Sequence, residues 1–147
     1  MHRPVEEDPE DREPDPAIPA TDVQMTLEEV STASGVAPEL VEQLATYGMV
    51  HPRKVGESKF YDGEALLVLR IAKEFFKYGV EPRHLTMYRH FADREAAFLQ
   101  AIILPILRQR NPEARRAAGE SLSDLADVAR RLKSTLLRSN LRKAVGP

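Results

Sequence analysis

Histidines and carboxylates gather in one short stretch, FKYGVEPRHLTMYRHFADREAAF, which spans residues 76–98. A metal site would need ligand atoms that converge on one ion. His84 and His90 are six residues apart, about 240° around a helix, so they cannot chelate an ion together. His2 and His51 lie far from them in the sequence. The spacing therefore predicts no metal site.

Catalysis would need a nucleophile with a base, or a pair of carboxylates. No glycine-rich elbow surrounds Ser121, Ser123, Ser134 or Ser139. The acids Glu81, Asp93 and Glu95 are better explained as helix-start residues that oppose the macrodipole. The chain has no cysteine, which excludes disulfides, thiolate catalysis and cysteine-ligated zinc. We therefore expect no enzyme activity and no cofactor.

The same stretch can also be a corner between two helices. Leu85, Tyr88 and either Phe91 or Ala92 are then expected to face the core. Basic side chains are expected on the outside, and they are Arg83, His84, Arg89 and Arg94. They would either pair with the nearby acids and fix the corner, or form a surface for a small anionic effector or a protein partner.

Length and composition indicate one domain of average size, preceded by an acidic N-terminal segment. The 147 residues are 42% apolar and carry a net charge of −2, but residues 1–25 hold eight acids against Arg3 and Arg12. Residues 1–24 are also rich in proline and poor in apolar side chains, which predicts a disordered tail or linker. An acidic arm that competes with nucleic acid for a basic face is the alternative. Without a membrane-length apolar run or a signal peptide, we expect a soluble cytoplasmic protein.

Local signals then predict a helix-turn-helix. Thr26 can cap a helix while Glu29 reaches back to its backbone N–H, which forms a capping box. Gly35 is expected to end this helix. Pro38 suits the first position of a second helix, which Gly48 should end.

A small hairpin and a third helix should follow. The segments RKV and KFY flank Gly56. Asp62 is expected to cap the helix GEALLVLRIAKEFFKY, which should end before Gly79. Its apolar residues are expected to be covered, among them Leu66, Leu67, Leu69, Ile71, Phe75 and Phe76. The predicted fold class is mostly α: a winged helix (helix-turn-helix plus small β-hairpin) over 25–91, followed by long C-terminal helices.

Residues 92–147 are expected to form a helical dimerisation or effector region. One helix should open at Asp93, after a break at Phe91–Asp93, and Pro105 should kink or split it. Asn111 and Pro112 should start a last helix that runs to about Arg142. Its apolar residues recur in steps of four and three, which favours a homodimer seam. They are Ala118, Leu122, Leu125, Ala129, Leu132 and Leu136.

The stretch TLEEVSTASGVAPELVEQLATYGMVHPRKVGESKFYDGEALLVLRIAKEFFKYGVEPRHL resembles the DNA-binding domain of MerR-family bacterial transcriptional regulators. More narrowly, YGVEPRHLTMYRHFADREAAF and RQRNPEAR are similar to the C-terminal domain of the FtsR-like actinobacterial branch. In that branch the resemblance implies a degenerate winged helix that follows a separate DNA-reading domain. Glu42 stands where the family's second helix carries a phosphate-gripping Arg-Tyr-Tyr run, whereas the wing keeps Arg53, Lys54 and Lys59.

Three functions follow from these patterns. The leading hypothesis is a regulatory and dimerisation domain of a MerR-type regulator that binds DNA through a preceding domain absent from this chain. The second is a stand-alone winged-helix protein that contacts DNA through the wing. The third is a protein–protein adaptor. None of them involves a membrane.

Overall fold

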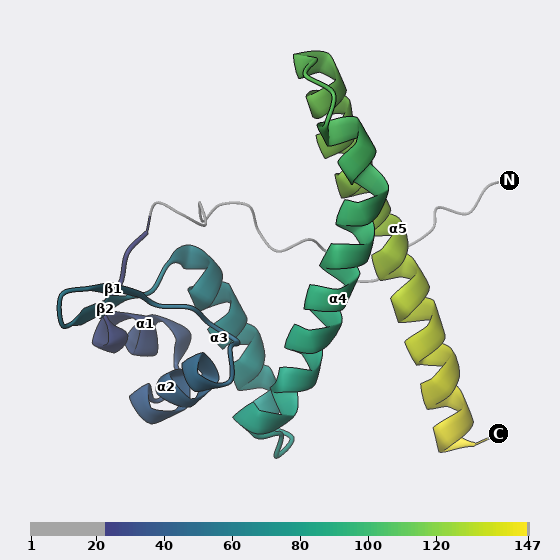
Figure 1. Ribbon diagram of the computed structural model, residues 1–147. Helices are drawn as coiled ribbons and strands as arrows, with labels where there is room; N and C mark the ends of the chain where they lie inside the picture. Colours follow the sequence, from purple (N-terminus) through teal and green to yellow (C-terminus); the bar gives the residue numbers. More distant parts are fainter. Residues whose placement is uncertain (1–22, 147) are drawn as a thin grey trace, which may run out of the picture. The chain divides into compact units, whose positions relative to one another are not determined.

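The computed structural model describes residues 23–146, so the expected tail at 1–24 lies almost entirely outside the described residues. The chain divides into two compact units, and the boundary falls after Arg89. The described elements, labelled in Figure 1, are α1 (Leu27–Ser34), α2 (Pro38–Thr46), β1 (Arg53–Val55), β2 (Ser58–Phe60), α3 (Gly63–Phe76), α4 (Pro82–Leu107) and α5 (Pro112–Val145). The expected fold class, mostly helical with a small hairpin and long C-terminal helices, is confirmed.

Helix α1 begins and ends where its local signals predicted. The Thr26 side chain accepts a hydrogen bond from the Glu29 backbone N–H, and the Glu29 side chain accepts from the Thr26 backbone N–H. Gly35 ends the helix at φ 73°, a left-handed conformation that costs glycine little because it lacks a Cβ atom. Pro38 is the first residue of α2, as predicted.

Strands β1 and β2 form the antiparallel hairpin, with Arg53 opposite Phe60, Lys54 opposite Lys59 and Val55 opposite Ser58. The second strand covers SKF rather than the predicted KFY. Tyr61 instead exchanges two backbone hydrogen bonds with Met25, of 2.8 and 2.7 Å. The segment before α1 is therefore tied to the end of the hairpin.

The core of the first unit lies where α1, α2 and α3 meet under the hairpin. Its largest fully buried side chains are Tyr61, Leu44, Leu69, Val30 and Val41. The Asp62 side chain caps α3 by accepting a 2.9 Å hydrogen bond from the Ala65 N–H. Not all of α3 is covered as expected, because Ile71 remains 53% exposed.

Helix α4 corrects the prediction of two helices in this region. It runs without interruption from Pro82 to Leu107, so neither the break at Phe91–Asp93 nor a split at Pro105 occurs. Residues 83–104 contain no glycine or proline. An aspartate in a helix interior costs less than about 1 kcal/mol, which is too little to end the helix. Pro105 lies only two residues from the helix end.

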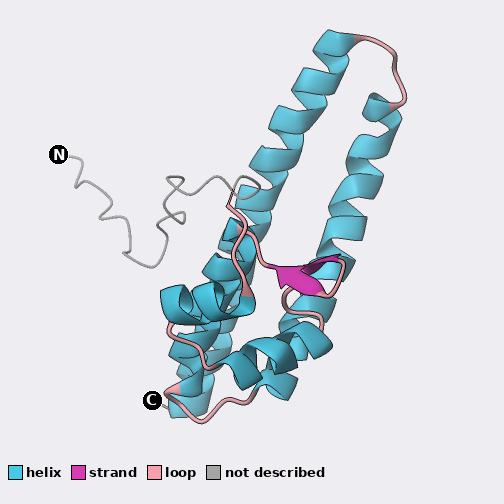
Figure 2. Ribbon diagram, turned by 90° about the vertical axis from the view of Figure 1, so that its left-hand side faces the viewer, coloured by secondary structure: helices cyan, strands magenta, loops and turns pink. Residues whose placement is uncertain are grey.

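The second unit is a helical hairpin of the C-terminal part of α4 and the whole of α5, joined by residues 108–111 (Figure 2). Its buried apolar residues are Leu99, Ile103 and Ala118. Lys133 Nζ lies 2.6 Å from Glu95 Oε2 and links the two helices. Helix α5 has 34 residues. It is therefore about 51 Å long, whereas residues 90–107 span about 27 Å and can cover only part of it.

Candidate functional site

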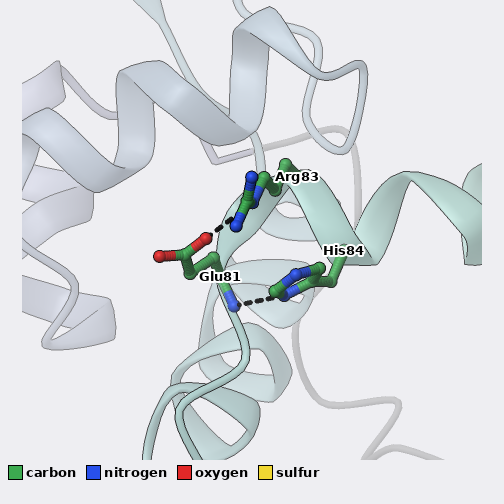
Figure 3. Close-up of polar contacts among 3 residues, drawn as sticks. All are labelled: Glu81, Arg83 and His84. Atoms are coloured by element: carbon green, nitrogen blue, oxygen red, sulfur yellow. Dashed lines mark hydrogen bonds and ion pairs between the residues drawn. The ribbon is translucent and has the colours of Figure 1, made fainter.

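Three polar residues of the stretch 76–98 lie together at the start of α4, and they are Glu81, Arg83 and His84 (Figure 3). Arg83 Nε lies 2.6 Å from Glu81 Oε2, and both side chains are exposed. The Glu81 backbone N–H donates a 3.0 Å hydrogen bond to His84 Nδ1. His84 thereby takes the role of the third residue in a capping box. These contacts organise the first turn of the helix, and an exposed ion pair adds only about 0–1 kcal/mol.

Arg89 is partly buried and makes long-range contacts. Its guanidinium donates to the carbonyl oxygens of Gly48 and Met49, at 2.8 and 3.2 Å. Arg94, the fourth residue of the expected effector surface, belongs to the second unit, whereas Arg83, His84 and Arg89 belong to the first. An effector surface that uses these four residues stays a prediction.

The apolar side of the corner differs in part from the expectation. Leu85 is buried, as predicted, with 2% of its surface exposed. Tyr88 and Phe91 are 46% and 52% exposed, and Ala92, the alternative to Phe91, is exposed as well. The prediction that Tyr88 and one of these two residues face the core is therefore wrong. The Tyr88 ring packs instead on Phe75, with 5.6 Å between the ring centroids.

A cleft lies between the outer face of α2 and the first turn of α4. It encloses about 470 Å³, and its lining residues are Leu40, Gln43, Tyr47, Glu81, Pro82 and Arg83. The exposed face of α2 also bears Glu39 and Glu42, and the helix contains no basic residue. This face therefore repels phosphate.

A second cavity of about 270 Å³ is almost wholly apolar. Its lining residues are Met49, Val68, Ile71, Ala72, Phe75, Leu85 and Tyr88. Sequence reasoning missed it because Ile71 and Phe75, four residues apart on an apolar helix, were both expected to be covered.

The hairpin presents the basic residues that were expected to contact DNA. Arg53, Lys54 and Lys59 are all exposed. Lys54 and Lys59 face each other across the ladder, and like charges in directly opposite positions are unfavourable. An anion placed between them would relieve that repulsion.

Tyr61 is a buried polar group beneath the hairpin. It is fully buried, and its hydroxyl has no hydrogen-bond partner within residues 23–146. Burial raises the pKa of this phenol, and the negative charge of Glu42 adds to the effect. A neutral phenol in the core is no acid–base catalyst. Within residues 23–146, no group of three or more His, Asp or Glu side chains could hold a metal ion.

The apolar seam expected on α5 is divided between two environments. Ala118 is fully buried, while Leu122, Leu125 and Ala129 are partly buried. Leu132 and Leu136, nearer the C-terminal end, are 59% and 56% exposed. No helix among the described residues is long and apolar enough to cross a membrane.

Comparison with known proteins identifies the family. Residues 23–145 match the family described as Rv1828-like, C-terminal domain. The HTH-type transcriptional regulators Rv1828 of Mycobacterium tuberculosis and Mb1859 of Mycobacterium bovis are each 30% identical to the chain over 126 residues. The match covers 86% of this chain and 50% of each relative, so the chain spans about half their length. The similarity supports a regulatory role, and the chain belongs to the Rv1828-like C-terminal domain family.

Proposed function

We propose that this chain is the regulatory and dimerising domain of a MerR-type DNA-binding regulator, that it acts in the cytoplasm and that it is not an enzyme. One observation carries the proposal. The family of C-terminal domains matches residues 23–145 of this chain. The alignments with the two mycobacterial regulators, however, cover only 50% of each regulator. The other half of such a regulator has room for a separate DNA-reading domain.

The charge of α2 supports this division of labour. In a helix-turn-helix the second helix enters the major groove. Here that helix exposes Glu39 and Glu42 and has no cation, whereas DNA binding is dominated by contacts between cations and phosphates. The first unit thus keeps the helix-turn-helix framework of a DNA-binding domain, but its second helix lacks the positive charge that phosphate contacts require.

The surface of the second unit supports dimerisation. Large apolar side chains are exposed on both of its helices. On α4 they include Phe91, Phe98 and Ile102, and on α5 they include Val128, Leu132, Leu136 and Leu141. Exposed apolar rows of this extent favour association over solvation. A dimer would hold two DNA readers at the spacing of two half-sites, and a partner or effector that changes this geometry would change DNA affinity.

A chimaera tests the proposal. The unmatched half of the Mycobacterium tuberculosis relative would be prepared alone and joined to this chain, and each protein titrated against duplexes with one or two half-sites. The joined protein should bind the two-site duplex more tightly than the reader alone, and the one-site duplex equally well. Equal binding of both duplexes by both proteins would contradict a dimerising role.

The hairpin favours a second candidate function, direct DNA contact by this chain. Lys54 and Lys59 are exposed, with Arg53 beside them, and the acid of the hairpin, Glu57, lies in the turn rather than opposite either lysine. Three cations on a short wing fit phosphate contacts rather than base reading. We therefore expect the wing to add non-specific affinity to a dimer that another domain directs to its site.

A further inference from the structure

The apolar cavity of about 270 Å³ lies wholly within the first unit. Three parts of the chain line it: the turn after α2, helix α3 and the first turns of α4. None of the seven lining residues is charged, and they are Met49, Val68, Ile71, Ala72, Phe75, Leu85 and Tyr88. All seven precede the boundary after Arg89, so one compact unit forms the complete cavity.

Helix α3 is apolar over more of its circumference than the core covers. Leu66 and Leu69 are buried in the core. A second apolar set recurs at the spacing i, i+3, i+4 and i+7, which places it on one side of the helix. Its members are Val68, Ile71, Ala72 and Phe75, and all four line the cavity. Ile71 remains 53% exposed, so an apolar molecule that displaces water from this side would bind favourably.

The walls of the cavity suit an aromatic ligand. The Phe75 ring of α3 and the Tyr88 ring of α4 both line it, with 5.6 Å between their centroids and 39° between their planes. Aromatic rings attract further rings in offset-stacked or edge-to-face contacts. Met49 adds a flexible thioether, which adapts to the shape of a ligand and contacts rings favourably.

Volume and charge narrow the class of ligand. An apolar protein cavity of about 150 Å³ holds benzene, so this one has room for roughly two fused rings. A shallower hollow shares Ile71 and Phe75 with the cavity and extends to Glu74 and Tyr78. Glu74 is the one charged residue, among those described, that lines either hollow. An anion would therefore lose hydration and meet a carboxylate rather than a cation.

We propose that this cavity binds an uncharged aromatic molecule of about two fused rings. The inference deepens the proposed function, because it names a class of effector, and it rests on that function for any effect on DNA. Arg89, next to Tyr88 in α4, donates a hydrogen bond to the carbonyl oxygen of Met49. A ligand between Met49 and Tyr88 would reinforce the same joint, and α4 continues from it into the second unit.

Binding of 2-naphthol to the full chain tests the site at pH 7, where this phenol is uncharged. Its Kd should lie below about 1 mM. The NMR methyl signals of Met49 and Leu85 should shift, whereas those of Val55 in the hairpin should not. The anion 2-naphthoate has the same rings and should bind roughly tenfold more weakly or worse, because the cavity offers it no cation. Isothermal titration calorimetry measures both affinities.

Two substitutions place the ligand in this cavity. Ala72→Leu should abolish binding while the chain stays folded, because the added carbons enter an existing hollow. Ile71→Ser should weaken binding roughly threefold or more, because it removes part of the apolar wall from a half-exposed position. Val55→Ser is the matched control, since Val55 is 51% exposed in the same unit but does not line the cavity. Circular dichroism checks the helix content of each variant.

Several results would overturn the site. The unaltered chain would show no binding at about 1 mM, or would bind 2-naphthoate as tightly as 2-naphthol. Folded Ala72→Leu and Ile71→Ser variants with unchanged affinity would place the ligand elsewhere. Loss of 2-naphthol binding in the chimaera would assign the cavity to a side chain of the other half of the regulator. A chain that dimerises without binding 2-naphthol refutes the ligand site alone, whereas a monomer that binds it refutes the proposed dimer alone.

Discussion

Arg89 Nε donates a 2.8 Å hydrogen bond to the carbonyl oxygen of Gly48, although 41 residues separate the two in the sequence. The same guanidinium donates to the next carbonyl, that of Met49, at 3.2 Å. Both carbonyls belong to the turn that follows α2, outside the hydrogen bonds of the helix, and buried backbone carbonyls need a donor from elsewhere. One side chain therefore fixes the first turns of α4 against the end of α2.

Loss of this arginine should destabilise the first unit. Arg89→Ala is expected to lower the free energy of unfolding by about 1–3 kcal/mol, because two partly buried carbonyls lose a charged donor. Arg89→Lys should recover only part of this, since an ammonium cannot reproduce the fork of a guanidinium. Urea unfolding followed by circular dichroism gives the values. Arg94→Ala, on an exposed site of the same helix, should stay within about 0.5 kcal/mol, and equal losses for the two alanine variants would refute the assignment.

The elements that the sequence predicted well depend on signals between near neighbours. The capping box of Thr26 and Glu29, the proline at the start of α2 and the caps at Asp62 and Asn111 all act within three residues. The contacts that the sequence did not reveal are long-range. Arg89 was expected on an outer surface, and nothing near it in the sequence indicates that it reaches Gly48.

The break expected in α4 failed for a related reason. Asp93 and Glu95 have the composition of a helix start, but this local preference is weak and the helix continues through both. Glu95 instead pairs with Lys133 of α5, 38 residues away. The apolar seam on α5 was recognised from its period, yet the period cannot tell which part α4 covers. That depends on the lengths of the two helices.

The buried phenol of Tyr61 gives a prediction about pH. Because burial raises its pKa in the folded state, the unfolded chain releases this proton at lower pH, near 10. Unfolding then releases a proton, so stability falls as pH rises above about 10. Tyr61→Phe should remove this part of the alkaline loss. At pH 7 it should leave stability unchanged or raise it by up to about 1 kcal/mol, because the hydroxyl has no partner among residues 23–146.

Thermal unfolding between pH 7 and 11 measures this effect. Tyr78→Phe is the matched control for the loss of a tyrosine hydroxyl, since the Tyr78 ring is 86% exposed. A loss greater than about 1 kcal/mol for Tyr61→Phe at pH 7 would mean that the hydroxyl has a bonding partner after all.

The opposed lysines of the hairpin give a third prediction. Lys59→Glu should stabilise the isolated chain by about 0.2–1 kcal/mol, because it turns a like-charged cross-strand pair with Lys54 into an ion pair. If the wing contacts phosphate, the same change should weaken binding to duplex DNA and reduce the dependence of log affinity on log salt concentration by about one.

Fluorescence anisotropy at two salt concentrations reports the DNA result. Lys77→Glu, on an exposed site outside the hairpin, supplies a control with the same change in charge. DNA binding that both variants weaken equally would reflect net charge alone and would remove the wing from the interface.

The division of the α5 seam gives the last prediction, which separates folding from association. Leu132 and Leu136 are more than half exposed, so replacing both with serine should change the free energy of unfolding of one chain by no more than about 0.5 kcal/mol. Leu122 and Leu125 are partly buried, and the same double replacement there should cost about 2–4 kcal/mol through lost apolar burial. Sedimentation should rank the two double variants in the opposite order. Replacing Leu132 and Leu136 should lower the affinity of the dimer while the helical hairpin stays folded, because exposed leucines are the ones available to a second copy. A dimer that survives the change at Leu132 and Leu136 undiminished would place its apolar contacts elsewhere, on the exposed row of Phe91, Phe98 and Ile102 along α4.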